Sequence, residues 1–250
     1  MTYTAKTYVI GIFWVVLGAG LGALSLSAAN FKSSAPLKGI VVNIDGFGND
    51  DGYFMKPTDI EHEIVQVIGS VSKHTVGDVS CDVVEDVLSK NPFISKVDVY
   101  VSGNGQLTAH IAQRKPILRV MSNGHNFYLD TEGKRMPVST HYTPHVHVLT
   151  GAAAEKHAED VLDLVQHIRD DEFMNAFVGQ LDYPVQGEVT LIPTVGHAEI
   201  LFGTPDRIAE KFENLKAFYS EVITEVGWDQ YRTIDLRFRD QIICKKNPTS

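Results

Sequence analysis

The sequence predicts an α+β protein: an N-terminal transmembrane helix, a small α+β domain, and then a mixed β-sheet domain with flanking helices. Three observations lead to this fold class. Residues 8–29 carry no charged side chain. The patterns in residues 39–114 predict the order strand, helix, helix, strand, strand. Residues 115–250 contain short β-rich segments, interrupted by two amphipathic helical segments. The composition, 44% hydrophobic and 21% charged, is that of a folded chain and excludes global disorder.

The N-terminal segment from Tyr8 to Ala29, which includes Trp14, is expected to be a transmembrane helix. No charged residue lies between Lys6 and Lys32, and the run is long enough as a helix to cross a hydrocarbon core of about 30 Å. Residues 1–7 are then a cytoplasmic stub, residues 30–38 a linker, and the rest of the chain lies outside the cytoplasm. This topology predicts a single-pass membrane protein.

Two further features of this segment leave alternatives open. Ser27 and Ala29 resemble a signal-peptide cleavage site, although the apolar run exceeds the usual signal-peptide length. Gly18 and Gly22 have the G-x-x-x-G spacing at which two membrane helices can pack closely, but small residues are also common in membrane helices.

The charge of the exported part excludes a nucleic-acid function. The chain has a formal net charge of −9, all 31 acidic residues follow Phe31, and Lys6 is the only basic side chain before it. An acidic surface of this kind repels phosphate backbones.

The first exported domain is expected to begin with a β-branched strand over residues 39–45, followed by a polar turn over residues 46–52. A helix then begins at Thr58, which forms a capping box with Glu61. Its apolar stripe comprises Ile60, Ile64, Val67 and Ile68.

A second helix is predicted over residues 82–89, and a hairpin with a turn at residues 103–105 completes this domain. The inward side chains of the helix are expected to be Val83, Val84, Val87 and Leu88. Alternation over residues 97–101 and 107–111 predicts the two strands of the hairpin. Two helices covering one face of a small sheet is the layout of a POTRA domain, a protein-docking module.

In the second exported domain, residues 115–250, short strands and two helices are expected. The strands are predicted at residues 117–121, 126–129, 146–149, 179–183, 188–192, 198–202, 231–238 and 241–245. One helix covers residues 155–169, with Val161, Leu164, Val165 and Ile168 on its apolar face. The other covers residues 206–226 and is capped by Thr204, with Pro205 at its first position. Arg239 and Asp240 form the tight connection between the last two strands.

Residues that could carry chemistry have simpler interpretations. His141, His145 and His147 lack a nearby cysteine or carboxylate, which favours exposed histidines at a strand entry over a metal site. Asp45 and the acidic turn at residues 49–51 depart from the spacing of an EF-hand loop, which favours a solvated turn. Catalytic motifs such as G-x-S-x-G, H-E-x-x-H and Walker A do not occur in the sequence, so neither an enzymatic activity nor a cofactor is expected.

Structural roles are also expected for the two cysteines and for two of the arginines. Cys81 and Cys244 lie in different predicted domains, so we favour two separate thiols over a disulfide. Arg114 and Arg237 are each expected to lie in a strand beside acidic sequence and to form ion pairs or caps that orient the two domains.

Four motifs, in order, make the chain resemble the bacterial FtsQ/DivIB family of cell-division proteins. The first is an Asn91-Pro92-Phe93 helix exit leading through the hairpin to Arg114-Lys-Pro116, in which Gln113 replaces the family's usual acidic residue. The others are Tyr128-Leu-Asp130-Thr-Glu-Gly133, Leu149-Thr-Gly151 and Ile234-Asp-Leu-Arg-Phe238. Together with the membrane segment they span nearly the whole chain.

The resemblance implies a non-enzymatic divisome scaffold at the division septum, anchored in the inner membrane with its C-terminal part in the periplasm. In the family, the POTRA domain helps recruitment, and the β domain binds FtsB/DivIC-like and FtsL-like division proteins by accepting a partner strand at an edge near the C-terminus. The matching positions are Phe238, Gln241, Ile242, Ile243, Cys244, Lys245 and Lys246. An unblocked terminal strand is a template for such strand addition, and Pro248 lies just beyond it.

The alternative function is a POTRA-bearing factor for outer-membrane assembly or secretion. Proteins of that class normally carry several POTRA domains, whereas this chain has room for one. A secreted enzyme with a cleaved leader is a third possibility, which the missing catalytic motifs disfavour.

Overall fold

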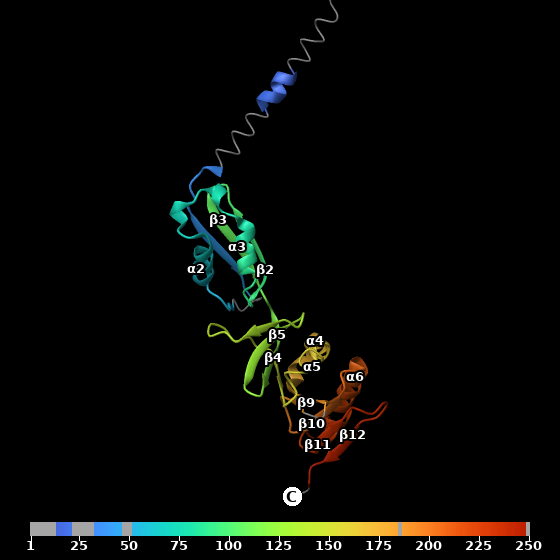
Figure 1. The fold of residues 1–250 in the computed structure, drawn as a ribbon. Coiled ribbons are helices and arrows are strands. Elements are labelled where there is room, and N and C mark those ends of the chain that lie inside the picture. Colours follow the sequence, from blue (N-terminus) through green and yellow to red (C-terminus); the bar gives the residue numbers. More distant parts are fainter. Residues whose placement is uncertain (1–13, 22–32, 47–51, 185–186, 249–250) are drawn as a thin grey trace, which may run out of the picture. The chain divides into compact units, whose positions relative to one another are not determined.

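A computed structural model describes residues 14–21, 33–46, 52–184 and 187–248. These residues form two compact units. The first comprises the residues up to Gly46 together with Met55–Gln113. The second comprises the short segment that ends at Phe54 and the residues from Arg114 onwards. Figure 1 traces both units along the chain.

The predicted transmembrane segment lies mostly outside the described residues, as do Tyr8, Gly22 and Ala29. Residues 14–21, which include Trp14 and Gly18, are helical, and the Trp14 side chain is exposed. Among the helices of the described part of the chain, none is both long and apolar enough to span a bilayer.

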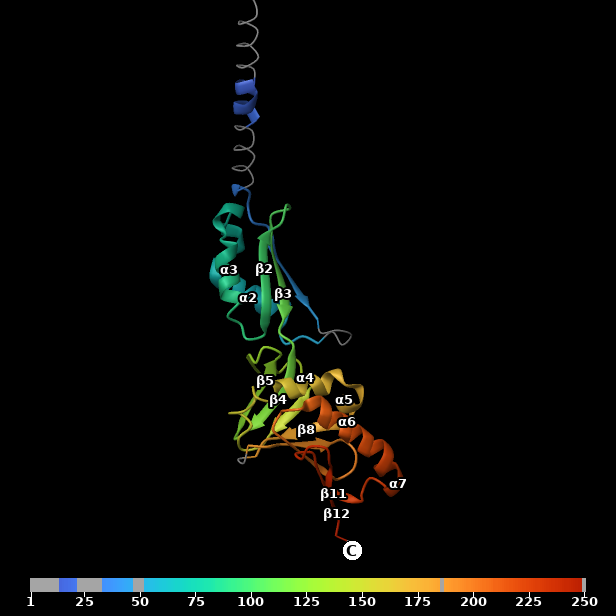
Figure 2. The same cartoon turned by 90° about the vertical axis from the view of Figure 1, so that its right-hand side faces the viewer.

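The first unit has a three-stranded sheet and two helices, in the predicted order. Its strands are β1 (Gly39–Asp45), β2 (Ile94–Val101) and β3 (Gln106–Gln113), and its helices are α2 (Pro57–Ile68) and α3 (Cys81–Leu88), with short 3-10 turns η2 (Val71–Lys73) and η3 (Val76–Asp78). The sheet order is β1-β3-β2, with β1 parallel and β2 antiparallel to β3. Figure 2 shows α2 and α3 beside each other on one face of the sheet.

Side-chain periodicity explains why these elements form. In the hairpin, Val99 lies opposite Ala109, and both are buried. Gly105, with a φ of 86°, provides the left-handed turn residue that this connection needs. The expected helix stripe is confirmed at Ile60 and Ile64, which are fully buried.

Three details of the first unit differ from the sequence prediction. Helix α2 begins at Pro57 rather than at a Thr58 cap, because Pro57 suits the first helical position and the Lys56 N–H is held by the Asp59 carboxylate at 3.1 Å. Val83 points outward and is 51% exposed. Part of the predicted linker is folded, since Pro36 forms a β-bridge with Thr75.

The second unit is a mixed sheet of nine described strands covered by helices. The strands are β4 (Pro116–Ser122), β5 (His125–Asp130), β6 (Arg135–Pro137), β7 (His147–Thr150), β8 (Val178–Asp182), β9 (Val189–Pro193), β10 (Glu199–Gly203), β11 (Tyr231–Asp235) and β12 (Ile243–Lys246). The helices are α4 (Leu162–Asp170), α5 (Glu172–Phe177), α6 (Ile208–Phe218), the π-helical turn η4 (Tyr219–Ile223) and α7 (Thr224–Val226). Figure 2 shows α4, α5 and α6 on the same side of the sheet.

One continuous core lies between these helices and the sheet. The predicted stripe of α4 is confirmed: Val161, Leu164, Val165 and Ile168 are all fully buried. From α6, Phe212 and Leu215 enter the same core. Burial of each such side chain contributes roughly 1.5–3 kcal/mol.

The two long helices of the second unit are shorter than predicted. Residues 152–161 form turns, and α4 begins at Leu162, because Ala154 and Ala158 pack into the core and His157 stacks on Tyr183 at 4.8 Å. Helix α6 begins at Ile208 rather than after a Thr204 cap, and its regular α-helical geometry ends at Phe218. The sequence prediction also missed β6 and α5.

The C-terminal hairpin is looser than predicted. Strand β11 ends at Asp235 and β12 begins at Ile243, so residues 236–242 form the connection instead of Arg239 and Asp240 alone. Phe238 therefore lies in this loop and not in a strand.

Candidate partner-binding edge

Strand β12 lies at one end of the nine-stranded sheet, whose order is β12-β11-β10-β9-β8-β7-β4-β5-β6. It pairs antiparallel with β11, with Asp235 opposite Ile243 and Tyr231 opposite Lys246. Within the described residues no strand pairs with its other side. The backbone N–H and C=O groups on that side are a template for another strand.

The predicted edge residues are placed as follows: Ile243, Cys244, Lys245 and Lys246 form β12, Gln241 and Ile242 directly precede it, and Phe238 lies in the preceding loop. Phe238 is 45% and Ile243 41% exposed, which leaves two large apolar side chains available at this edge. Ile242 and Cys244 are half-buried against the core. The edge thus alternates between core-facing and outward side chains, as a half-buried strand does.

The opposite end of the sheet is protected. Strand β6 is short and contains Pro137, a residue that cannot donate to a ladder. Beside it, the Ser139 hydroxyl donates to the Phe54 carbonyl at 3.0 Å. The Phe54 ring packs against Tyr128 and Tyr142. Of the two ends of this sheet, β12 is therefore the less obstructed.

Arg237 holds the start of the loop between β11 and β12. Its guanidinium forms a two-pronged pair with Asp235, at 2.8 and 2.6 Å, and reaches Glu188 at 2.6 Å. Hydrogen bonds from Arg237 lower the pKa of the Asp235 carboxyl, which therefore stays ionised. A Cβ at Gly203 would lie 2.7 Å from the Arg237 Cγ, so glycine makes room for this side chain.

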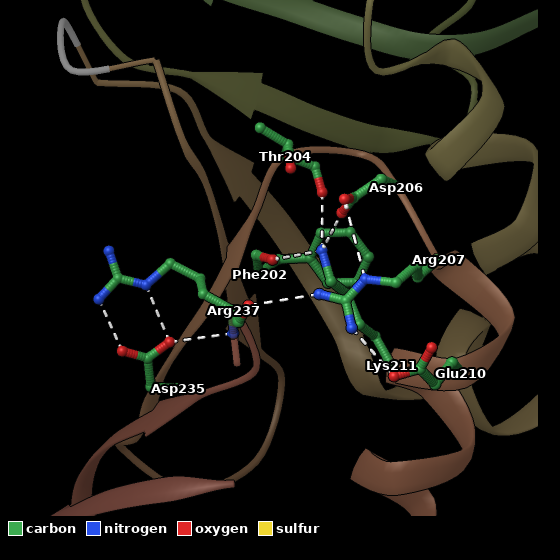
Figure 3. A network of polar contacts seen from close by, with 8 residues as sticks. All are labelled: Phe202, Thr204, Asp206, Arg207, Glu210, Lys211, Asp235 and Arg237. Atoms are coloured by element: carbon green, nitrogen blue, oxygen red, sulfur yellow. Dashed lines mark hydrogen bonds and ion pairs between the residues drawn. The ribbon is translucent and has the colours of Figure 1, made fainter. Parts of the chain in front are cut away.

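A buried cation sets the start of α6, as Figure 3 shows. The Lys211 side chain is 3% exposed, and its ammonium group donates to the Phe202 and Thr204 carbonyls and to Asp206, at 3.0, 2.8 and 2.7 Å. These bonds fold residues 202–206 back against the first turn of α6, which explains why the helix begins later than predicted. Arg207, in a left-handed conformation, donates to the Arg237 carbonyl at 3.3 Å and so ties α6 to the loop before β12.

The ion pairs expected for the two arginines are confirmed, but neither arginine lies in a strand as predicted. Arg114 lies between strands and pairs with Asp130 at 2.7 Å, with both side chains largely buried. Gln113, at the position where the family has an acid, donates to the Asp45 carbonyl at 3.0 Å. Glu188, Asp206 and Lys211 were not predicted, since only the fold brings them to this region.

The histidine group does not assemble into a metal site in the described part of the chain, where no cluster of three potential ligands occurs. His141 and His145 are exposed, but His147 is buried, contrary to prediction, and its ring Nε2 lies 3.2 Å from the Asn175 amide oxygen. Burial lowers the pKa of His147. Asp45 is exposed, and residues 49–51 of the acidic turn lie outside the described residues. Cys81 and Cys244 are free thiols.

Two comparisons with known proteins bear on the unit that carries this edge. The model of a protein family described as "FtsQ/DivIB, C-terminal related" matches residues 115–245. The chain is also similar to the "Cell division protein FtsQ" of Geotalea daltonii, with 29% identity over 171 residues, which covers 64% of this chain and 61% of that relative. The match thus spans less than two thirds of the relative's length.

Proposed function

The chain belongs to the FtsQ/DivIB family, and we propose that it is a non-enzymatic scaffold of the bacterial divisome that binds FtsB/DivIC-like and FtsL-like proteins through β12. Family membership implies a role in cell division. The proposed partners and the way they bind go beyond that role, and the observation that supports them is the position of β12 at the less obstructed end of the sheet.

Strand addition at β12 is physically reasonable. A partner strand would satisfy the outward N–H and C=O groups of residues 243–246 and place its side chains beside Phe238 and Ile243, the exposed apolar residues of this edge. Lys245 and Lys246 add positive charge, which favours an acidic partner segment. In an otherwise acidic chain, these two lysines give the edge a distinct charge.

The remaining segments of the chain would bring the protein to the membrane and to the division site. We propose that residues 8–29 anchor the protein in the inner membrane and that residues 1–7 remain cytoplasmic. The strand-helix-helix-strand-strand unit would act as a POTRA domain that contributes to recruitment to the septum. A fluorescent fusion of the full chain should gather at midcell, whereas a uniform signal around the envelope would favour the outer-membrane assembly factor.

The direct test is binding of an FtsB-type partner by edge variants of the full chain. Phe238→Glu and Ile243→Glu should each weaken partner capture at least tenfold, because exposed apolar side chains at a strand edge are typical hot spots. Val195→Glu, at a residue that is 52% exposed in the β9–β10 connection, is the matched control and should bind like the wild type. Wild-type capture by both edge variants, with unchanged unfolding temperature, would contradict the proposed site.

A further inference from the structure

Two hollows flank the exposed ridge of α6 and its π-helical continuation. The first, of about 230 Å³, lies between this helix and the loop before β12 and is lined by Val222 and Ile242, among others. The second, of about 540 Å³, lies on the other side of the helix against Phe173 and Trp228. Ala217 and Glu221 line both hollows, so they form the ridge between them.

The second hollow presents aromatic surface. Phe173 is 36% and Trp228 43% exposed, although both rings pack against other aromatic residues: Phe173 on Phe177 at 5.1 Å and Trp228 on Tyr219 at 5.3 Å. Because Tyr219 and Phe177 are buried, they hold these partly exposed rings in fixed positions. Rigid, partly exposed aromatic residues are typical anchors of protein interfaces.

The ridge between the hollows is lowest at Ala217, where a bound polypeptide could cross the helix. Ala217 is exposed and has the smallest side chain that lines either hollow. The π-helical turn begins two residues later, at Tyr219. Such turns inside α-helices are rare and are frequently found at functional sites. A polypeptide could cross the helix at Ala217 without meeting a large side chain.

The charged residues of the ridge indicate which charged side chain a bound polypeptide would place there. Lys216 is engaged by Asp171 and Glu213, at 2.8 Å each. Glu221 is exposed, and no ion pair within the described residues involves it. An unpaired carboxylate on the ridge favours a Lys or Arg in the bound chain.

We infer that the polypeptide that adds a strand to β12 continues past Ile242, crosses α6 at Ala217, and places an apolar side chain against Phe173 and Trp228 and a basic one near Glu221. This inference rests on the proposed function. It follows from continuity, because Ile242 directly precedes β12 and lines the hollow that leads to the ridge.

Site-specific photo-crosslinking in cells tests this path. The full chain would carry a photoreactive amino acid at Ala217 or at Ile243, with Val195 as the exposed control. We expect both test positions to crosslink to the same FtsB-type polypeptide, at two neighbouring peptides, and the control to give no such product. Crosslinking from Ile243 but not from Ala217, or from Ala217 to a different protein, would overturn the path over α6 and leave the function intact. Absence of the product from Ile243 would instead contradict strand addition.

Binding measurements on purified full chain separate the contributions. Ala217→Arg should weaken binding of the FtsB-type ectodomain at least tenfold, whereas Ala217→Ser should bind like the wild type. Glu221→Gln should reduce the dependence of affinity on salt, because it removes the carboxylate that attracts the basic side chain. Unchanged affinity of Ala217→Arg, with wild-type unfolding temperature, would overturn the inference.

Discussion

Arg114 and Asp130 form a largely buried ion pair, with 2.7 Å between the Nη1 and Oδ2 atoms. The other Asp130 oxygen accepts the Glu132 and Lys134 N–H groups, each at 2.8 Å. Two family motifs that are separate in the sequence therefore meet: the arginine before β4 orients the aspartate that shapes the turn after β5. The conformation of this turn depends on a residue 16 positions away.

Replacing Arg114 with alanine should destabilise the second unit by about 3–5 kcal/mol, because the Asp130 carboxylate would remain buried without its partner. Urea unfolding of residues 33–250 measures this loss. Lys90→Ala is the control, since the Lys90–Asp86 pair is exposed and should contribute less than about 1 kcal/mol. Equal losses of unfolding free energy in the two variants would show that burial does not determine how much the Arg114–Asp130 pair contributes to stability.

Gly151 should not tolerate a side chain. Its φ is 107°, and a Cβ there would lie 2.3 Å from the Tyr183 carbonyl oxygen. We expect Gly151→Ala to cost more than about 2 kcal/mol from backbone strain and overlap together. Gly39→Ala, where a Cβ meets open space, should change the unfolding free energy by less than about 1 kcal/mol. A thermal unfolding series that ranks the two variants in the opposite order would refute this.

His147 should make the second unit sensitive to mild acid. Burial lowers its pKa below the ordinary value of 6.5, so between the folded and unfolded pKa values the unfolded chain binds more protons. The stability contributed by neutral His147 is thus present above pH 6.5 and falls as the pH drops towards the folded pKa. In His147→Gln the unfolding free energy should change less between pH 7 and pH 5, whereas the exposed control His145→Gln should keep the wild-type slope. If the unfolding free energy changes with pH equally in all three proteins, His147 is not the source of the acid sensitivity.

Two adjacent proline substitutions should separate pairing with a partner from pairing within the sheet. Neighbouring residues of an edge strand direct their N–H groups to opposite sides. Of Cys244→Pro and Lys245→Pro, one should therefore weaken partner binding with little loss of stability, and the other should lower the unfolding temperature by disturbing the contact with β11. Affinity and thermal unfolding measured on the same samples check this. If neither substitution lowers affinity, the outer edge of β12 is not the binding surface.

Local patterns were the most reliable part of the sequence prediction. The bounds of β1 agree residue for residue, and the apolar stripe of α4 lies in the core because a period of 3.6 places those side chains on one face. Helix ends were less predictable. The start of α6 depends on the bonds of Lys211 to the Phe202 and Thr204 carbonyls, contacts that require β10 and α6 to be folded together.

By itself, the sequence determined the types and order of the strands and helices in the first unit, the absence of a recognisable catalytic motif and the resemblance to a cell-division family. Those features follow from side-chain periodicity and short motifs, which are local. Only the tertiary structure decided that β12 ends the sheet, that Arg237 reaches Glu188, 49 residues away, and that Ala217 lies between two hollows. Strand order and long-range ion pairs depend on the path of the whole chain, because distant segments meet only when the core between them is formed.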